Sequence, residues 1–221
     1  MCKKTENTEQ QFRNAMAECR ELFVKKLHDY GASWRILRPS SLTDQLYIKA
    51  KRIRSLEIKR EAMVDEGIRP EFMAIINYGI VGLIQIEKGF ADEVDMTPEE
   101  AMTHYDRHAQ EALALMLRKN HDYDEAWRSM RVSSYTDFIL TKLQRVKEME
   151  DLQGRTLVSE GIDSNYMDII NYAVFGVIKL SRQSHKGKKS WHRRRERKTT
   201  GPPKKKRAAG WLGYWSTCAA S

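Results

Sequence analysis

The amino-acid sequence predicts an all-α fold built from two copies of a three-helix unit. Residues 26–52 and 119–145 are identical at 13 of 27 aligned positions, and residues 66–86 and 160–180 at 10 of 21. Apolar residues recur at helical spacing, and no segment shows the alternation of apolar and polar residues that is typical of a half-buried strand. Self-similarity at a fixed separation of about 90 residues indicates a tandem duplication.

Each unit is expected to begin with a long helix. We place repeat unit 1 at residues 1–93 and repeat unit 2 at residues 94–181, with first helices at about residues 9–26 and 98–119. Thr97, Pro98 and Glu100 mark the start of the helix in unit 2. Thr is a good N-cap, Pro suits the first helical position, and Glu three residues after the cap completes a capping box.

The second helix of each unit is predicted to start at a serine. Ser41 and Ser134 are followed three residues later by Asp44 and Asp137, a spacing that is typical of helix caps. Apolar residues at helical spacing follow in both units: they are Leu46, Ile53 and Leu56 in unit 1, and Ile139, Leu143 and Val146 in unit 2.

The third helices, at about residues 71–88 and 165–180, are apolar around most of their circumference, which predicts burial. Because three helices alone bury little apolar surface, we expect the two third helices to pack together about a pseudo-two-fold axis, as in a covalently fused homodimer. The protein is therefore expected to be a monomer with internal pseudo-symmetry or a homodimer.

Composition points to a cytoplasmic protein without a membrane span. The longest apolar run, residues 167–180, has 14 residues, whereas a membrane-spanning helix needs about 20. The first residues lead into no apolar stretch, so no secretory signal is expected. The three cysteines are widely spaced and suggest neither a disulfide framework nor a zinc site, which fits a reducing compartment.

Positive charge is concentrated at the C-terminal end. Residues 182–221 carry 13 Lys and Arg against one acidic residue, a net +12, so with +9 overall the other residues carry −3. We expect this basic tail to be disordered. The alternatives are an arm that binds nucleic acid through its cations and an out-of-frame end that replaces the normal last turns.

Polar and aromatic residues repeated in both units are the candidates for a binding site, because a helical bundle requires apolar stripes but no identical polar side chains. The candidates are His28, Asp29, Tyr30, Trp34, Lys49, Arg52 and Asn77 in unit 1, and His121, Asp122, Tyr123, Trp127, Lys142, Arg145 and Asn171 in unit 2.

Each candidate also has a purely structural interpretation. Lys49 and Arg52 lie one helical turn apart, which suits a polyphosphate but also a solvated stripe. The aromatic residues are either core side chains or platforms on which bases stack. Asn77 and Asn171 interrupt an apolar helix, where an unpaired amide costs about 1–3 kcal/mol. Each therefore bonds across the pseudo-two-fold axis or contacts a ligand.

Acidic residues are the candidates for a magnesium site. Mg²⁺ prefers oxygen ligands, and Glu148, Asp151 and Asp168 of unit 2 are expected to lie on facing helices. These acids are not repeated, so a metal site would lie in one unit or be split between the two. The sequence contains no P-loop, dinucleotide-binding, nucleophile-elbow or HExxH pattern.

The repeated residues resemble a known family. The motif HDYG-x2-W-x3-R-x-S-S-x-T-D, followed by K-x2-R, E-G-I and I-I-N-Y, is similar to the all-helical nucleotide modification associated domain of the first type, which occurs in bacteria and phages, often in tandem. The resemblance covers about residues 9–181 and departs at Asp124, where unit 1 has Gly31.

Members of that family look similar in turn to MazG-like nucleoside triphosphate pyrophosphohydrolases, which hold Mg²⁺ with E-x2-E and E-x2-D motifs on two helices. Here the second helix carries Lys-x2-Arg at the repeated place, and the second motif is reduced to Asn165-x2-Asp168.

The resemblance implies a nucleotide-binding protein of bacterial nucleotide metabolism or base modification. One hypothesis is a Mg²⁺-dependent pyrophosphohydrolase-like enzyme, with Asp168 and either Glu148 or Asp151 on the metal. The alternative is a non-catalytic module that binds nucleotide or DNA. In both, the four repeated cations Lys49, Arg52, Lys142 and Arg145 are predicted to line one concave surface that faces the two HDY segments.

Overall fold

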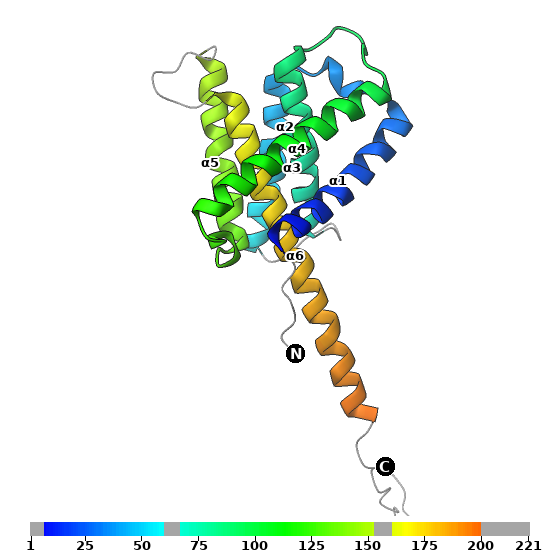
Figure 1. The fold of residues 1–221 in the computed structure, drawn as a ribbon, viewed down its shortest axis with the longest axis vertical. Coiled ribbons are helices and arrows are strands. Elements are labelled where there is room, and N and C mark those ends of the chain that lie inside the picture. Colours follow the sequence, from blue (N-terminus) through cyan, green and yellow to red (C-terminus); the bar gives the residue numbers. More distant parts are fainter. Residues whose placement is uncertain (1–6, 60–66, 153–160, 200–221) are drawn as a thin grey trace, which may run out of the picture. The chain divides into compact units, whose positions relative to one another are not determined.

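A computed structural model describes residues 7–59, 67–152 and 161–199, with side chains up to residue 181 (Figure 1). All regular structure in these ranges is helical. Unit 1 consists of α1 (Thr8–Tyr30), a 3₁₀ turn η1 (Ser33–Ile36), α2 (Pro39–Lys59) and α3 (Ile68–Lys88). Unit 2 consists of α4 (Pro98–Asp122), η2 (Ala126–Arg128), α5 (Val132–Asp151) and α6 (Ile162–Thr199). The all-α class and the duplication are confirmed.

The end of the chain divides from the repeats near the predicted boundary. Residues 1–183 form one unit and residues 184–221 a second. Helix α6 extends to Thr199, beyond the predicted end of repeat unit 2 at residue 181. Residues 200–221 of the predicted disordered tail lie outside the described part of the chain.

The predicted helix starts are correct for α4 and wrong for α2 and α5. Thr97 accepts a hydrogen bond from the Glu100 amide, and the Glu100 side chain accepts one from the Thr97 amide, which completes the capping box. Helices α2 and α5 begin two residues before the predicted serine caps, at Pro39 and Val132. In α2, Pro39 suits the first helical position because a proline loses no hydrogen bond there. With these starts, Ser41 and Ser134 fall within the first turns of their helices.

The two aspartates that were expected in caps instead join the second helices of the two units. Asp44 forms an ion pair with Lys147 at 2.6 Å, and Asp137 forms one with Arg54 at 3.8 Å. Residues 44 and 137 correspond in the two units, as do 54 and 147. The pairs are therefore related by the pseudo-two-fold axis.

A second set of reciprocal contacts lies between α2 and α5. The Thr43 hydroxyl donates to Glu150 at 2.7 Å, and the corresponding Thr136 hydroxyl donates to the corresponding Glu57 at 3.3 Å. Burial raises the pKa of both glutamates above the usual value of 4.5. The threonine–glutamate bond is thus present on both sides of the axis, whereas Thr43 has a further bond to the Tyr166 hydroxyl at 2.8 Å, for which the corresponding Phe72 offers no hydroxyl.

The third helices pack together, as predicted, and glycines allow their close approach. A Cβ atom at Gly82 would overlap the ring of Tyr166, and one at Gly176 would lie 2.9 Å from the ring of Phe72. Residues 82 and 176 correspond, as do 72 and 166, so the two glycine–aromatic contacts are reciprocal. They place α3 and α6 against each other about the pseudo-two-fold axis.

The core runs through both units and includes much of α3. Ile75, Ile76, Ile80 and Ile84 are fully buried there, which confirms the burial that the apolar circumference predicted. Within the described ranges, none of the helices combines the length and the hydropathy that a membrane crossing would need.

Candidate ligand-binding site

The structure contains two pockets at equivalent places, one in each unit. The repeat-two pocket lies between the end of α4, η2, α5 and α6, and the repeat-one pocket between the end of α1, η1 and α3. Of the 13 residues that line the repeat-two pocket, 11 have their counterpart in the lining of the repeat-one pocket. A pocket that survives in both copies is a property of the fold rather than an accident of side-chain packing.

Five of the shared lining positions hold the same residue in both units. They are Lys26 and Lys119, Tyr30 and Tyr123, Trp34 and Trp127, Asn77 and Asn171, and Tyr78 and Tyr172. The predicted Tyr, Trp and Asn candidates are thus brought together in each unit.

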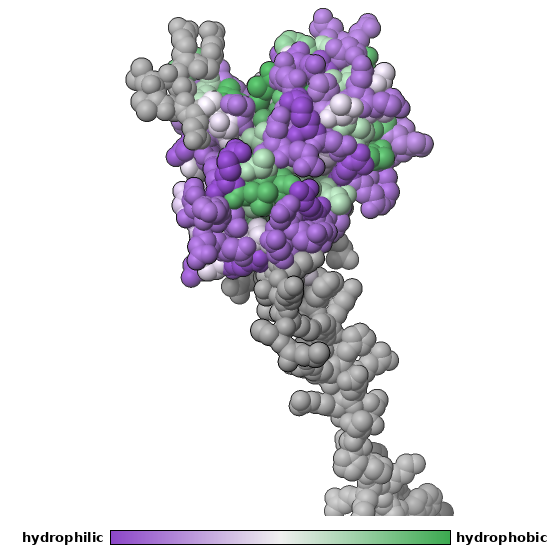
Figure 2. Space-filling model, in the orientation of Figure 1, coloured by the Kyte–Doolittle hydropathy of each residue, from purple (hydrophilic) through white to green (hydrophobic). Residues whose placement is uncertain are grey.

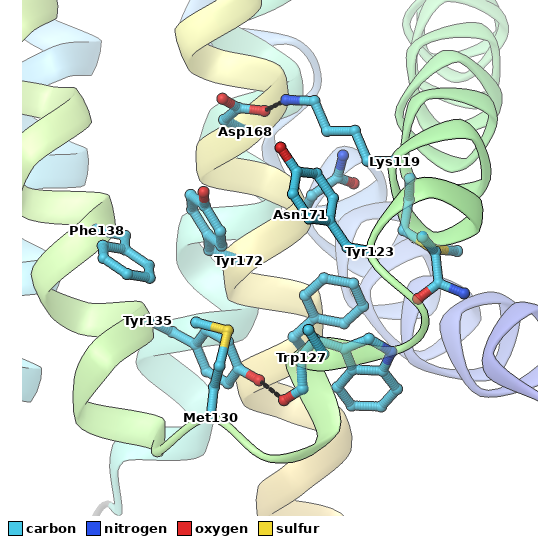
Figure 3. Close-up of a pocket in the computed structure, with 13 residues that line it drawn as sticks. Lys119, Tyr123, Trp127, Met130, Tyr135, Phe138, Asp168, Asn171 and Tyr172 are labelled. Atoms are coloured by element: carbon cyan, nitrogen blue, oxygen red, sulfur yellow. Dashed lines mark hydrogen bonds and ion pairs between the residues drawn. The ribbon is translucent and has the colours of Figure 1, made fainter.

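The repeat-two pocket has an aromatic part and a charged end (Figure 3). Its volume is about 240 Å³, slightly below the roughly 300–1,000 Å³ of pockets for drug-sized ligands. Asp168 and Lys119 lie at one end of the view, Trp127, Met130 and Tyr135 at the other, and Asn171 between them. Figure 2 shows that the visible face is mostly hydrophilic, with a hydrophobic area near the crossing of α4 and α6.

The aromatic wall is held rigidly by its neighbours. The Trp127 indole stacks on Phe175 with ring centroids 4.6 Å apart, and the Arg128 guanidinium lies 4.5 Å from the Trp127 ring. The Tyr135 hydroxyl donates to the Trp127 carbonyl oxygen, which fixes η2 against α5. Tyr123 is 70% exposed at the rim, so the pocket is open to solvent on that side.

The charged end consists of one carboxylate and two ammonium groups. Asp168 is buried on α6 and pairs with Lys142 of α5 at 2.7 Å and with Lys119 of α4. Lys119 is half exposed, whereas Lys142 is largely covered. The cluster carries a net charge of +1 beside the aromatic part of the pocket.

The amide of Asn171 is the least satisfied group in the pocket. Asn171 is 6% exposed, and neither its Nδ2 nor its Oδ1 atom hydrogen-bonds to any residue that the structure describes. A buried polar group without a partner costs about 1–3 kcal/mol. Asn171 therefore offers both a donor and an acceptor to whatever enters the pocket.

The corresponding Asn77 is fully engaged. Its Nδ2 atom donates to the Cys19 carbonyl oxygen at 3.1 Å, and its Oδ1 atom accepts from the Tyr105 hydroxyl at 2.8 Å. Because Tyr105 belongs to α4, this bond joins the two units, as one of the two interpretations of Asn77 proposed. The same interpretation fails for Asn171 within the described residues.

The predicted cationic surface is wrong. Lys49 and Arg52 both pair with Glu71, which is 4% exposed, and the Lys49 Nζ atom lies 3.3 Å from its carboxylate. Lys142 pairs with Asp168, and Arg145 lines a different groove, between α2 and α5. Three of the four cations thus neutralise buried carboxylates. A buried carboxylate is costly unless a cation lies beside it, which explains why these cations are repeated.

The HDY segments lie at the C-terminal ends of α1 and α4. Tyr30 is the last residue of α1, and His121 and Asp122 lie in the last turn of α4. His28 pairs with Asp29 and His121 with Asp122, and all four side chains are mostly exposed. Only the tyrosine of each HDY segment lines a pocket.

The three acids expected to bind Mg²⁺ do not form a metal site. Among the side chains that the structure describes, no group of three or more His, Cys, Asp or Glu could hold a metal ion. Asp168 is neutralised by two lysines, and Glu148 lines the groove that contains Arg145. The donor set of unit 2 therefore does not fit the magnesium ion that the MazG-like resemblance implies.

Some lining residues were missed by the sequence analysis. Lys26 and Lys119 are identical in the aligned repeats, so the repetition itself contained the signal. Phe138 and Phe175 have the counterparts Gln45 and Val81, and no repetition marks them.

Comparison with known families identifies the duplicated unit. The family model of nucleotide modification associated domain 1 matches residues 26–86 and 119–180. These two segments contain the ends of α1 and α4, the second helices, and the parts of α3 and α6 that line the pockets. Searches of curated proteins and of solved structures found no match. The chain belongs to the nucleotide modification associated domain 1 family and carries one copy of the domain in each repeat.

Proposed function

We propose that the protein binds a nucleotide, with the base in the repeat-two pocket, and that it does so without catalysing hydrolysis. The observation that carries the proposal is the buried Asn171 amide, whose donor and acceptor have no partner among the described residues. An asparagine side chain can bond bidentately to the edge of a base, and such a bond would satisfy both atoms.

The surroundings of Asn171 support a planar aromatic ligand. Bases in single strands and loops are recognised by stacking on aromatic side chains and by hydrogen bonds to their edges. Tyr123, Tyr172 and Trp127 line the pocket around the amide. A volume of about 240 Å³ suits one ring system with its attached sugar better than a larger ligand.

The charged end supports a sugar phosphate next to the base. Lys119, which lines the pocket, could contact a phosphate, while Asp168 could accept hydrogen bonds from sugar hydroxyls. With a net charge of +1, this end suits a monophosphate better than a triphosphate. Hydrolysis of a triphosphate assisted by metal would require several acids around one ion, and the described residues do not converge in that way.

Isothermal titration with common ribo- and deoxyribonucleosides, their 5′-monophosphates and short single-stranded oligonucleotides tests the proposal. At least one base should bind, inorganic phosphate alone should not, and the oligonucleotide arm distinguishes a free nucleotide from a base within a strand. The Asn171→Leu variant should bind about 5- to 150-fold more weakly, the loss expected for two hydrogen bonds of 0.5–1.5 kcal/mol each.

The two pocket tyrosines provide a matched control. Tyr123 and Tyr30 occupy corresponding positions and are both more than half exposed, so replacement by alanine should leave folding intact. Tyr123→Ala should weaken binding and Tyr30→Ala should not. The proposal is refuted if no ligand binds at millimolar concentration, or if Asn171→Leu binds as the wild type does.

A further inference from the structure

The two pockets differ in the state of one amide. In the repeat-one pocket, Asn77 accepts a hydrogen bond from Tyr105, which is 1% exposed and stacks on Phe23 with ring centroids 4.5 Å apart. The Tyr105 hydroxyl is thus held in place and occupies the acceptor atom that Asn171 leaves open in the repeat-two pocket. A hydroxyl from the protein thus already donates to the amide oxygen that, in the proposed function, accepts from the ligand.

The residue that corresponds to Tyr105 in unit 1 is Phe12. Five buried positions of α1 and α4 coincide along the helices: Thr8, Phe12, Ala15, Cys19 and Phe23 match Ala101, Tyr105, His108, Ala112 and Met116. Phe12 is fully buried and has no hydroxyl to donate. The Tyr105 hydroxyl therefore occupies the Asn77 Oδ1 atom, whereas Phe12 cannot occupy Asn171 in the same way; the Asn77 Nδ2 atom also donates to the Cys19 carbonyl oxygen.

We propose that the repeat-one pocket is a second site for a planar base, masked in the native chain by the Tyr105 hydroxyl, so that the protein binds one ligand, in the repeat-two pocket. This inference rests on the proposed function. It also identifies Phe12 as the residue that keeps the repeat-two site open, because a hydroxyl there would occupy Asn171.

The other lining residues of the masked site are in place, and with Tyr105 removed Asn77 would regain a free acceptor while its Nδ2 atom keeps the bond to the Cys19 carbonyl oxygen. Lys26, Tyr30, Trp34 and Tyr78 line it as their counterparts line the other pocket, and its volume is about 330 Å³. Ala74 stands where unit 2 has Asp168, so no carboxylate from this position opposes Lys26. The unmasked site should therefore prefer a nucleoside monophosphate to the uncharged nucleoside.

Nuclear magnetic resonance of the tryptophan indole groups reports each pocket separately in the full chain. Trp34 lines one pocket and Trp127 the other, and Trp34→Phe and Trp127→Phe variants assign their signals. The probe is the monophosphate that binds the wild type in titration. In the wild type it should shift the Trp127 signal alone, with one ligand per chain.

Two variants test the masking directly. Tyr105→Phe should bind two ligands per chain and shift both indole signals. Phe12→Tyr should weaken binding at Trp127 by about tenfold, the loss expected when a hydrogen bond of about 1.4 kcal/mol is pre-empted. If Tyr105→Phe does not fold, the masking is tested by the Phe12→Tyr variant and by the number of ligands that each wild-type chain binds.

The outcomes separate this inference from the proposed function. Two ligands per wild-type chain, a single shifted signal in folded Tyr105→Phe, or unchanged binding by Phe12→Tyr would overturn the masking, even though a base binds. If the wild type binds no base, the proposed function and the masking both fail.

Discussion

The same substitution at the two corresponding asparagines should change stability in opposite directions. Asn171→Leu removes two buried polar atoms that have no partner among the described residues. Leucine has the same branching and the same number of side-chain heavy atoms, and an unsatisfied buried group costs about 1–3 kcal/mol. Asn171→Leu should therefore stabilise the ligand-free protein by about 1–3 kcal/mol.

Asn77→Leu should destabilise it. The substitution leaves the buried Tyr105 hydroxyl without its acceptor, at about 1–3 kcal/mol, and removes the bond to the Cys19 carbonyl oxygen, at about 1 kcal/mol. The sum is about 2–4 kcal/mol. For a domain of this size, 1 kcal/mol corresponds to about 2–4 °C in melting temperature.

Thermal unfolding of both variants without ligand, followed by circular dichroism, measures the difference. Asn171→Leu should melt about 2 °C or more above the wild type, and Asn77→Leu about 4 °C or more below it. Equal losses in the two variants would show that the Asn171 amide is satisfied within the protein. That result would remove the main support for base recognition.

Four further predictions follow from the packing. Glu71→Gln should lower the urea midpoint by the equivalent of about 2–3 kcal/mol. This is less than the roughly 3–5 kcal/mol for breaking a fully buried pair, because Lys49 and Arg52 are each nearly a third exposed. An unchanged midpoint would mean that these ion pairs do not stabilise the fold. Because the pKa values of Glu57 and Glu150 are raised in the folded state, their contribution to stability is complete below about pH 4.5 and is lost as pH rises through the folded values. The double variant Glu57→Gln, Glu150→Gln should therefore lose less melting temperature than the wild type between pH 4.5 and 7.5, and parallel curves would contradict this. Gly82→Ala should lower the free energy of unfolding by about 1–3 kcal/mol, because the added Cβ would overlap Tyr166. Gly67→Ala, with no atom within 4 Å of its Cβ, serves as the control. Equal losses of stability in the two variants would refute the close packing of α3 on α6. A chain that ends at residue 183 should melt within a few degrees of the full chain, since the repeats form a separate unit, and a large drop would show that the tail supports them.

The fold was predictable because the duplication repeats its apolar pattern. Apolar spacing located the six helices, and the all-apolar circumference of α3 identified it as buried. The starts of α2 and α5 were missed because Ser41 and Asp44 have the spacing of a cap, whereas Asp44 forms an ion pair with Lys147 of the other unit. Local sequence does not reveal such a distant partner.

The candidate site was predictable only in part. Repetition selected Tyr30, Trp34 and Asn77 with their counterparts, and the structure brings them into two pockets. Repetition also selected Lys49 and Arg52, which pair with the buried Glu71 instead of lining a pocket. A cation can be repeated because it neutralises a buried acid as well as because it binds a ligand. The buried acid that pairs with these cations is Glu71 in unit 1 and Asp168 in unit 2. Asp168 lies one turn further along the corresponding helix. The two acids therefore do not align in the repeats, although both pair with the repeated cations.

The reciprocal contacts between α2 and α5 have a genetic consequence. In a homodimer encoded by a single unit, every mutation appears on both sides of the axis, so a change that helps one half is imposed on the other. In this chain each half has its own codons. Thr43 and Thr136 have kept the same partners, whereas positions 12 and 105 have diverged to Phe and Tyr. Duplication thus allows mutation to assign different tasks to two halves that still share one symmetric interface.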